Sequence, residues 1–186
     1  WFAPHLSTLQ AAGRLLVAYS GGLDSSVLLH TVQALAGAER IIAIHVNHHL
    51  SPNSGHWQQH CTELCASLAI KLIVRDVSVQ ARGDGLEQAA RRARYQVFEE
   101  LVAEQDILLM AHHQDDQLET LLYRLVRGSG PKGLAGMPET RTLGRGRLLR
   151  PLLDIPRSAL LSYAVANNLQ WVEDESNQSP LFDRNF

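Results

Sequence analysis

Leu15-Leu16-Val17-Ala18-Tyr19 leads directly into Ser20-Gly21-Gly22-Leu23-Asp24-Ser25, so an apolar run meets two glycines and then a segment with helical spacing. In an open α/β sheet, ligands bind where a strand ends and the next helix begins. The glycines let the backbone approach a ligand, and serine hydroxyls together with the first helical amides can hold phosphate oxygens. We therefore expect an anion-binding loop, formed by Ser20, Gly21, Gly22, Leu23, Asp24 and Ser25.

Asp24 gives this loop a negative charge at the place expected for phosphates. The helix N-terminus stabilises an aspartate, but phosphates would repel it unless a divalent cation lay between them. The loop also lacks the lysine of a Walker A motif and the third glycine of a dinucleotide-binding motif. We expect Asp24 to bind Mg²⁺, and a glycine turn followed by a capping aspartate is the alternative.

The rest of the chain continues the alternation of strand and helix. Three more apolar, β-branched runs follow, at Ile41–Val46, Lys71–Val77 and Ile107–Ala111. The segments between them have helical spacing; Gly37 is expected to end the first helix, and Asp84 with Glu87 to form a capping box at the third. Continuous apolar strands that alternate with helices predict an α/β fold with a doubly wound, Rossmann-like parallel sheet.

Length and composition exclude several classes of protein. The chain has 186 residues, 45% hydrophobic and 19% charged, with a net charge of −2, which is typical of one compact domain and excludes disordered and collagen-like chains. No apolar run approaches the ~20 residues of a membrane span, and no signal peptide is visible, so we expect a cytoplasmic protein without membrane contact. Cys61 and Cys65 are spaced unsuitably for a disulfide and are expected to be small buried hydrophobes.

Basic residues gather in the last third of the chain. From Arg124 to Arg157 there are eight basic residues against two acidic ones. Glycines and prolines in the same stretch predict a long loop over about 128–150. Such a local excess favours contact with a polyanion, through Arg145, Arg147 and Arg150, and a solvated arginine-rich loop is the alternative.

A second group of candidates follows the fourth apolar run. His112, Asp116 and Glu119 are spaced i, i+4 and i+7, so they share one helical face if the helix begins near His113. They could bind a metal, an ammonium group or both, and the imidazole could assist a metal or a phosphate. The alternative is structural, with Asp115 or Asp116 capping the helix.

Arginines also cluster on the third expected helix. Glu87 lies four residues before Arg91, which predicts an exposed ion pair. Arg91 and Arg94 remain candidates for contacts to RNA or phosphate.

The loop Ser20–Ser25 resembles the SGGxDS signature of PP-loop ATPases, and the wider sequence resembles the tRNA(Ile)-lysidine synthetase family within that superfamily. The further segments that carry the resemblance are His45–Leu50, Leu86–Tyr95, Ala111–Thr120, Arg127–Gly130, Gly133–Met137, Arg150–Leu153 and Trp171–Asn177. It extends from about Leu15 to Asn185, with departures at His49, where the family usually has Gly, and Glu175, where it has Pro.

The resemblance implies a ligase that uses ATP and Mg²⁺. ATP would activate the 2-carbonyl of the wobble cytidine in an isoleucine tRNA, and L-lysine would then displace AMP to form lysidine. The residues expected in catalysis are Asp24, His112, Asp116 and Glu119. Asp116 and Glu119 would also bind lysine, and the tRNA would be contacted by Arg91, Arg94, Arg145, Arg147 and Arg150.

The resemblance also predicts a domain organisation, and two alternative functions remain open. We expect residues 1–186 to form an N-terminal PP-loop domain of a longer protein whose C-terminal domains help to hold the tRNA; a homodimer is left open. One rival is another PP-loop enzyme that thiolates tRNA or forms amides, although thiolases need additional paired cysteines. The other is an adenine-nucleotide-binding module without turnover, which ATP binding without AMP formation would identify.

Overall fold

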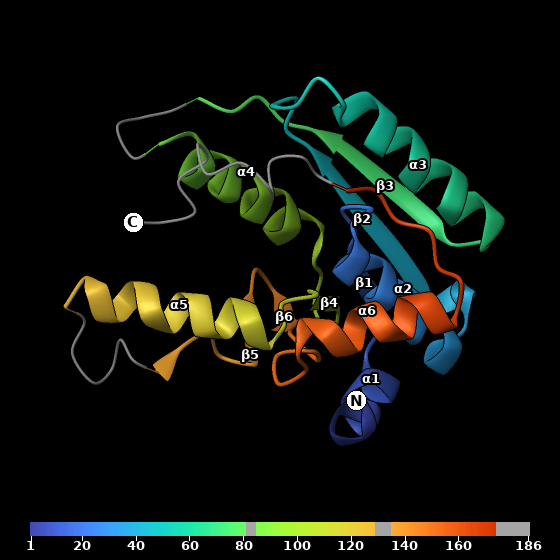
Figure 1. The fold of residues 1–186 in the computed structure, drawn as a ribbon. Helices are drawn as coiled ribbons and strands as arrows, with labels where there is room; N and C mark the ends of the chain where they lie inside the picture. Colours follow the sequence, from blue (N-terminus) through green and yellow to red (C-terminus); the bar gives the residue numbers. More distant parts are fainter. Residues whose placement is uncertain (81–84, 129–134, 174–186) are drawn as a thin grey trace.

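The computed structural model describes residues 1–80, 85–128 and 135–173 (Figure 1). The strands are β1 (Leu15–Ala18), β2 (Ile41–Asn47), β3 (Lys71–Asp76), β4 (Ile107–Leu109), β5 (Thr140–Leu143) and β6 (Gly146–Leu149). The helices are α1 (Leu6–Ala11), α2 (Leu23–Ala36), α3 (Ser54–Ser67), α4 (Leu86–Leu101), α5 (Gln114–Val126) and α6 (Arg157–Ala166), with short 3-10 turns at Ala3–His5 and Ala38–Arg40.

The strands form one sheet in the order β3-β2-β1-β4-β6-β5, in which only the edge strand β5 is antiparallel to its neighbour. The expected α/β fold with a doubly wound sheet is confirmed. The chain proceeds from β1 to β2 on one side and later returns to β4 on the other, so β1 and β4 flank the point where strand order reverses. Ligands bind beyond the carboxyl ends of the strands at such a point.

Both faces of the sheet are covered, which explains why the strands are continuously apolar. One core joins Leu15 and Val17 of β1 to α2, α3 and α6. The other joins Leu16, Ile44 and Leu108 to α4 and the β5–β6 pair. Figure 1 shows α4 apart from α2, α3 and α6 across the strands. In the described part of the chain, no helix is long and apolar enough to cross a membrane.

Several local expectations are confirmed and one cannot be judged. Gly37 ends α2 with a φ of +80°, a conformation that favours glycine. Cys61 and Cys65 are free and buried. Gly85 is the N-cap of α4, with no side-chain cap bond, and the expected cap Asp84 lies outside the described residues.

The expected loop over 128–150 is wrong for its second half. Residues 140–149 form the β5–β6 hairpin, which continues the sheet beyond β4 and turns at Gly144 with a φ of +54°. Leu143, Leu148 and Leu149 are buried. Their burial stabilises the hairpin, although arginines lie between these leucines in the sequence. Residues 129–134 lie outside the described part.

A buried carboxylate joins the amino ends of β1 and β4, opposite the glycine loop. Asp106, 3% exposed, accepts hydrogen bonds from Arg14 Nε (3.0 Å to Oδ1) and from the Ala103 amide (2.8 Å to Oδ2). Burial alone would raise the pKa of Asp106, but the hydrogen bonds from Arg14 and Ala103 lower it overall.

We expect Asp106→Asn to lower the free energy of unfolding at neutral pH by about 1–3 kcal/mol, because an amide cannot replace these charge-assisted bonds. A depressed pKa gives stability that is present above the unfolded-state value and lost as pH falls through the folded-state value. The difference between parent and variant should therefore shrink between about pH 7 and about pH 3, measured by urea unfolding. Asp154→Asn, at an exposed position, is the control; an equal difference at both pH values would contradict the prediction.

Candidate functional site

The glycine loop after β1 is held by its own hydroxyl groups. Ser20 Oγ and Ser25 Oγ lie 3.0 Å apart, and Ser25 Oγ donates to the Gly22 carbonyl at 3.0 Å. The Gly22 amide donates to Ser20 Oγ at 3.3 Å. Gly22 is the N-cap of α2, and no side chain caps the helix. The first amides of α2 therefore face the loop as donors for an anion.

Gly21 is the more tightly enclosed of the two glycines of the loop. Its φ is +86°, and a Cβ there would lie 2.9 Å from Cys61 Sγ and 3.2 Å from Val172 Cγ2. The Gly21 carbonyl accepts a hydrogen bond from the Val172 amide at 2.9 Å. The loop therefore packs against α3 and is hydrogen-bonded to the segment that follows α6.

Asp24 is connected to α5 through a histidine that the sequence interpretation did not single out. His113 Nε2 lies 3.6 Å from Asp24 Oδ2 and 3.5 Å from Asp116 Oδ2. His113 is also the N-cap of α5: its amide donates to Asp116 Oδ2 at 2.9 Å, and the Asp116 amide donates to His113 Nδ1 at 3.4 Å. The expectation that an acid caps this helix is confirmed for Asp116. On the other side, Arg157 Nε lies 3.9 Å from Asp24 Oδ1.

The surroundings of His113 favour its charged form. Burial alone would lower its pKa, but the nearby carboxylates of Asp24 and Asp116 raise it overall. An imidazole between two carboxylates can hold or release a proton near neutral pH. The bridge therefore links the glycine loop to the acidic start of α5 through a titratable group.

The geometry at Asp24 fits a magnesium ion that is also bound by phosphates. Asp24 Oδ1 is buried and has no hydrogen-bond partner. No group of three or more His, Cys, Asp or Glu side chains within the described ranges could hold a metal by itself. Mg²⁺ is commonly bound by one or two carboxylates together with substrate phosphates. A single carboxylate oxygen beside a loop with free helix amides is compatible with that pattern.

The structure places His113, and not the expected His112, in contact with Asp116. His112 accepts a hydrogen bond from Arg150 Nε at 3.2 Å through Nδ1. Burial and the charge of Arg150 lower the pKa of His112 to about 3, so it is neutral at physiological pH. The sequence rule for helix caps could not single out His113, because histidine is not among the residues that usually occupy the N-cap. Glu119 lies exposed on α5.

The arginine candidates separate into buried and exposed sets. Arg150 is 3% exposed, which contradicts its expected role as a surface contact to RNA. Arg94 is partly buried, and its Nε is buried without a hydrogen-bond partner. The predicted ion pair of Arg91 with Glu87 is not formed; Arg91 lies over the Tyr95 ring, 5.0 Å from its centroid. Arg145 and Arg147 are exposed on the β5–β6 hairpin.

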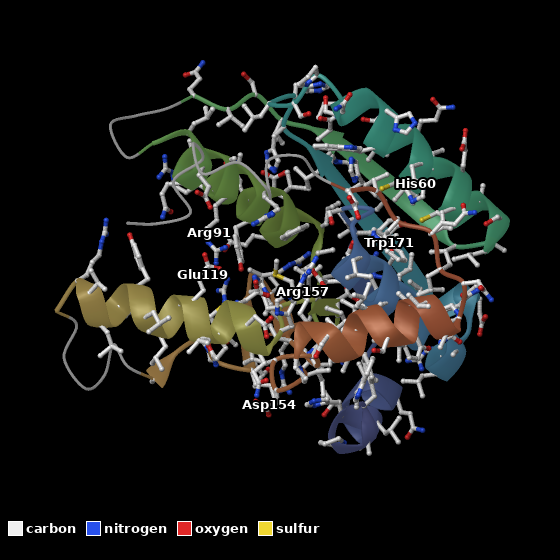
Figure 2. All side chains as sticks on the ribbon, viewed as in Figure 1. His60, Arg91, Glu119, Asp154, Arg157 and Trp171 are labelled. Carbon is white, nitrogen blue, oxygen red and sulfur yellow. The ribbon has the colours of Figure 1, made fainter. Side chains whose placement is uncertain are left out.

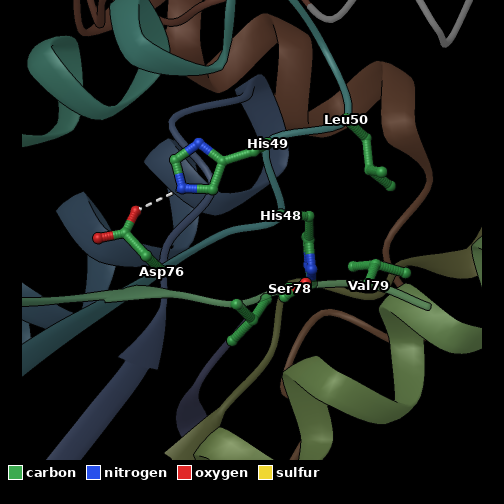
Figure 3. A pocket seen from close by; sticks show the side chains of 7 residues that line it. His48, His49, Leu50, Asp76, Ser78 and Val79 are labelled. Carbon is green, nitrogen blue, oxygen red and sulfur yellow. Dashed lines mark hydrogen bonds and ion pairs between the residues drawn. The ribbon is translucent and has the colours of Figure 1, made fainter.

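A pocket of about 450 Å³ opens at the carboxyl ends of β2 and β3 (Figure 3). Its lining includes His48, His49, Leu50, Asp76 and Val79, with His49 Nε2 2.8 Å from Asp76 Oδ1. His48 Nδ1 is buried without a partner, and burial together with Arg94 lowers the His48 pKa to about 4. The pocket lies on the same edge of the sheet as the glycine loop.

Comparison with known proteins agrees with this geometry. The PP-loop domain family matches residues 3–186. A tRNA(Ile)-lysidine synthase of Pseudomonas aeruginosa is 51% identical over 184 residues, 97% of this chain and 41% of that protein. One from Alkalilimnicola ehrlichii is 49% identical over 187 residues, 99% of this chain and 42% of that protein. The chain therefore spans about two fifths of the length of these relatives.

Solved structures show the same fold at low sequence identity. A U34-tRNA thiolase of Methanococcus maripaludis with its [4Fe-4S] cluster has a TM-score of 0.69 at 17% identity, covering 91% of this chain and 65% of that chain. A glutamine-dependent NAD+ synthetase of Acinetobacter baumannii in complex with ADP has a TM-score of 0.58 at 17% identity, covering 88% and 30%.

We expect Gly21→Ala to lower the free energy of unfolding by roughly 1–3 kcal/mol, because the positive φ and the short distance to Cys61 both penalise a Cβ. Gly22→Ala is the matched control, since Gly22 has a φ of −75° and a Cβ there would meet Ser20 Oγ only at 3.5 Å. Chemical unfolding of both variants makes the comparison. An equal loss of unfolding free energy in both variants would contradict the prediction, because the positive φ and the close contacts of Gly21 would then add no cost of their own.

Proposed function

This chain belongs to the PP-loop domain family, and we propose that it uses ATP to adenylate the wobble cytidine of an isoleucine tRNA and then joins L-lysine to it, forming lysidine. The observation that carries the proposal is the bridge from Asp24 through His113 to Asp116. It connects a loop suited to phosphates with carboxylates suited to an amine. The similarity to tRNA(Ile)-lysidine synthases over nearly the whole chain supports the same reaction.

The loop and its neighbours form the nucleotide side of the proposed site. Ser20, Ser25 and the first amides of α2 would bind phosphate oxygens, and Asp24 would hold Mg²⁺. The metal would offset the charge of the phosphates when bound. The pocket at His48 lies along the same edge and is our candidate for the nucleoside. Catalysis on this side rests on positioning and electrostatic stabilisation.

The start of α5 forms the amine side of the proposed site. Asp116 and Glu119 are about one turn apart, so two carboxylates are available for the ammonium groups of lysine. The attacking amine must lose a proton, and the Asp116 carboxylate with His113 beside it would accept that proton. Selection of lysine over arginine would come from pocket shape, because an ammonium is a compact charge and a guanidinium is a planar fork.

Neither rival function suits the described residues as well. Burial raises the pKa of Cys61 to about 12 and that of Cys65 to about 11, and Cys61 lies beneath Gly21. These two thiols, the only cysteines of the chain, are unsuited to sulfur transfer. A nucleotide-binding module without turnover would have no use for Asp116 and Glu119.

The remaining partners follow from the proposed reaction. The exposed Arg145 and Arg147 would contact tRNA phosphates, and further domains would help to hold the tRNA, since the relatives are more than twice as long. We also propose that the enzyme works in the cytoplasm, where its substrates are found.

The decisive experiment incubates the full-length protein with ATP, Mg²⁺, labelled lysine and bulk tRNA, and measures lysine joined to RNA and AMP formed. We expect Asp24→Asn to reduce AMP formation by about 10²–10³-fold, the range for removal of one preorganised electrostatic interaction. Asp154→Asn, which removes an exposed carboxylate outside the loop, is the matched control. AMP formation by Asp24→Asn at the parental rate would refute the metal role, and label absent from RNA with the parent would refute the proposed function.

We expect Arg145→Gln combined with Arg147→Gln to weaken tRNA binding and flatten its salt dependence, while ATP binding is retained. Removing one arginine–phosphate ion pair should lower the slope of log K against log salt by ~0.7–0.9. Binding of tRNA at several salt concentrations provides the measurement. An unchanged slope would show that Arg145 and Arg147 do not contact tRNA phosphates and are simply solvent-exposed residues of the hairpin.

A further inference from the structure

Three helices of the described chain begin around Asp24. Asp24 lies in the first turn of α2, and its carboxylate contacts the N-cap residue of α5, His113, and the first residue of α6, Arg157. The Gln114 amide donates to the Ile155 carbonyl at 2.9 Å, which holds the starts of α5 and α6 together. From there the two helices run in opposite directions (Figure 1), and the labelled Arg157 lies where they begin (Figure 2). The amino ends of helices carry partial positive charge, so the surroundings of Asp24 attract anions.

Arg157 occupies an unfavourable position for the stability of its own helix. It is the first residue of α6, which has no acidic residue in its first turn and no side-chain cap. The positive end of the helix dipole repels a cation at this position and would stabilise an acid there. The arginine therefore does not stabilise α6, and its side chain extends to Asp24 on another helix. Places where a sequence breaks such a local rule are typical of functional residues.

The ion pair between Arg157 and Asp24 is loose. Arg157 Nε lies 3.9 Å from Asp24 Oδ1, and this buried oxygen has no hydrogen-bond partner. The side chain of Arg157 is 54% exposed and that of Asp24 is 30% exposed. By contrast, Arg14 Nε donates at 3.0 and 3.1 Å to the two carboxylate oxygens of the buried Asp106. Exposed ion pairs contribute little to stability, so Arg157 can leave Asp24 without disturbing the fold.

Arg157 and Asp24 each have a second possible partner at this site. A guanidinium binds carboxylates and phosphates with the same planar set of donors. Phosphates that bind at the glycine loop would therefore compete with Asp24 for Arg157. Two cations beside one carboxylate repel each other, so Asp24 favours either Arg157 or a metal ion.

We propose that Arg157 balances the charge of Asp24 until a nucleotide binds, and then pairs with the phosphates of that nucleotide. This inference rests on the proposed use of ATP and Mg²⁺ and deepens it. Without nucleotide, Arg157 opposes the entry of a second cation at Asp24. Once phosphates pair with Arg157, the Asp24 carboxylate is free to bind the metal. Arg157 is thus a positioning residue that couples the two ligands, and such coupling is reciprocal.

The inference predicts two opposite effects of removing the charge of Arg157. In Arg157→Gln, Asp24 lacks its resident cation, so a divalent metal should bind the nucleotide-free protein more tightly. The same variant lacks a partner for the phosphates, so ATP should bind less tightly when no metal is present. A residue that only supported the fold would weaken both kinds of binding, because its loss would disturb the whole site.

The test uses the full-length protein and two probes: Mn²⁺ without nucleotide, followed by EPR of the free ion, and ATP in the presence of EDTA, followed by calorimetry. We expect Arg157→Gln to tighten Mn²⁺ binding and to weaken metal-free ATP binding, each by roughly 5- to 20-fold, which lies in the range for coupled sites. Arg157→Lys keeps the charge and should restore most of both affinities to the parental values. Adding Asp24→Asn to Arg157→Gln should remove the gain in Mn²⁺ binding, because the gain requires the Asp24 carboxylate.

Arg75→Gln is the matched control, because Arg75 is an exposed arginine of β3 and its loss changes the net charge equally. Both of its affinities should equal those of the parent. If Arg157→Gln binds Mn²⁺ no more tightly than the parent, or binds metal-free ATP equally well, the role of Arg157 is refuted while the proposed function stands. If both shifts are observed but the parent joins no lysine to tRNA, the proposed reaction is refuted and the role of Arg157 stands.

Discussion

The parallel pairing of β1 with β4 is the constraint on which the site depends. Leu15 pairs with Ile107 and Val17 with Leu109, so the carboxyl ends of two strands about 90 residues apart in sequence reach the same edge of the sheet. The glycine loop follows one strand, and the capping residue of α5 follows the other. The contacts of His113 with Asp24 and Asp116 are possible only because these two strand ends are neighbours.

Charged groups of both signs gather at the same edge. Asp24 lies 3.6 Å from His113 Nε2 and 3.9 Å from Arg157 Nε, and the guanidinium groups of Arg91 and Arg141 lie over the Tyr95 ring. At the opposite edge, Arg14 and Asp106 pair closely, which suits a purely structural contact. A close ion pair of this kind stabilises a fold, whereas a cluster of titratable groups with shifted pKa values is more typical of a functional site.

Some elements and site residues could be predicted from the sequence and others could not, because only some structural features leave a recognisable pattern of residue types. Strands buried on both faces are continuously apolar, so β1 to β4 and the glycine loop were predictable. The β5–β6 hairpin was not, because its two short strands each carry an arginine, Arg141 and Arg147, and therefore resemble a loop. His112 and His113 differ by one position at a strand end, where a shift of one residue reverses the side on which a side chain lies. The burial of Arg150 has no sequence signal, since arginine is usually exposed.

The hydrogen bond from the Val172 amide to the Gly21 carbonyl links the glycine loop to a segment about 150 residues later. During synthesis the loop therefore leaves the ribosome long before its last backbone partner exists. At typical elongation rates this delay is roughly 10–30 s. A nascent chain that ends before this segment would carry every residue of the glycine loop and still lack the backbone contact that encloses it. Translation thus produces the loop early and completes its enclosure late.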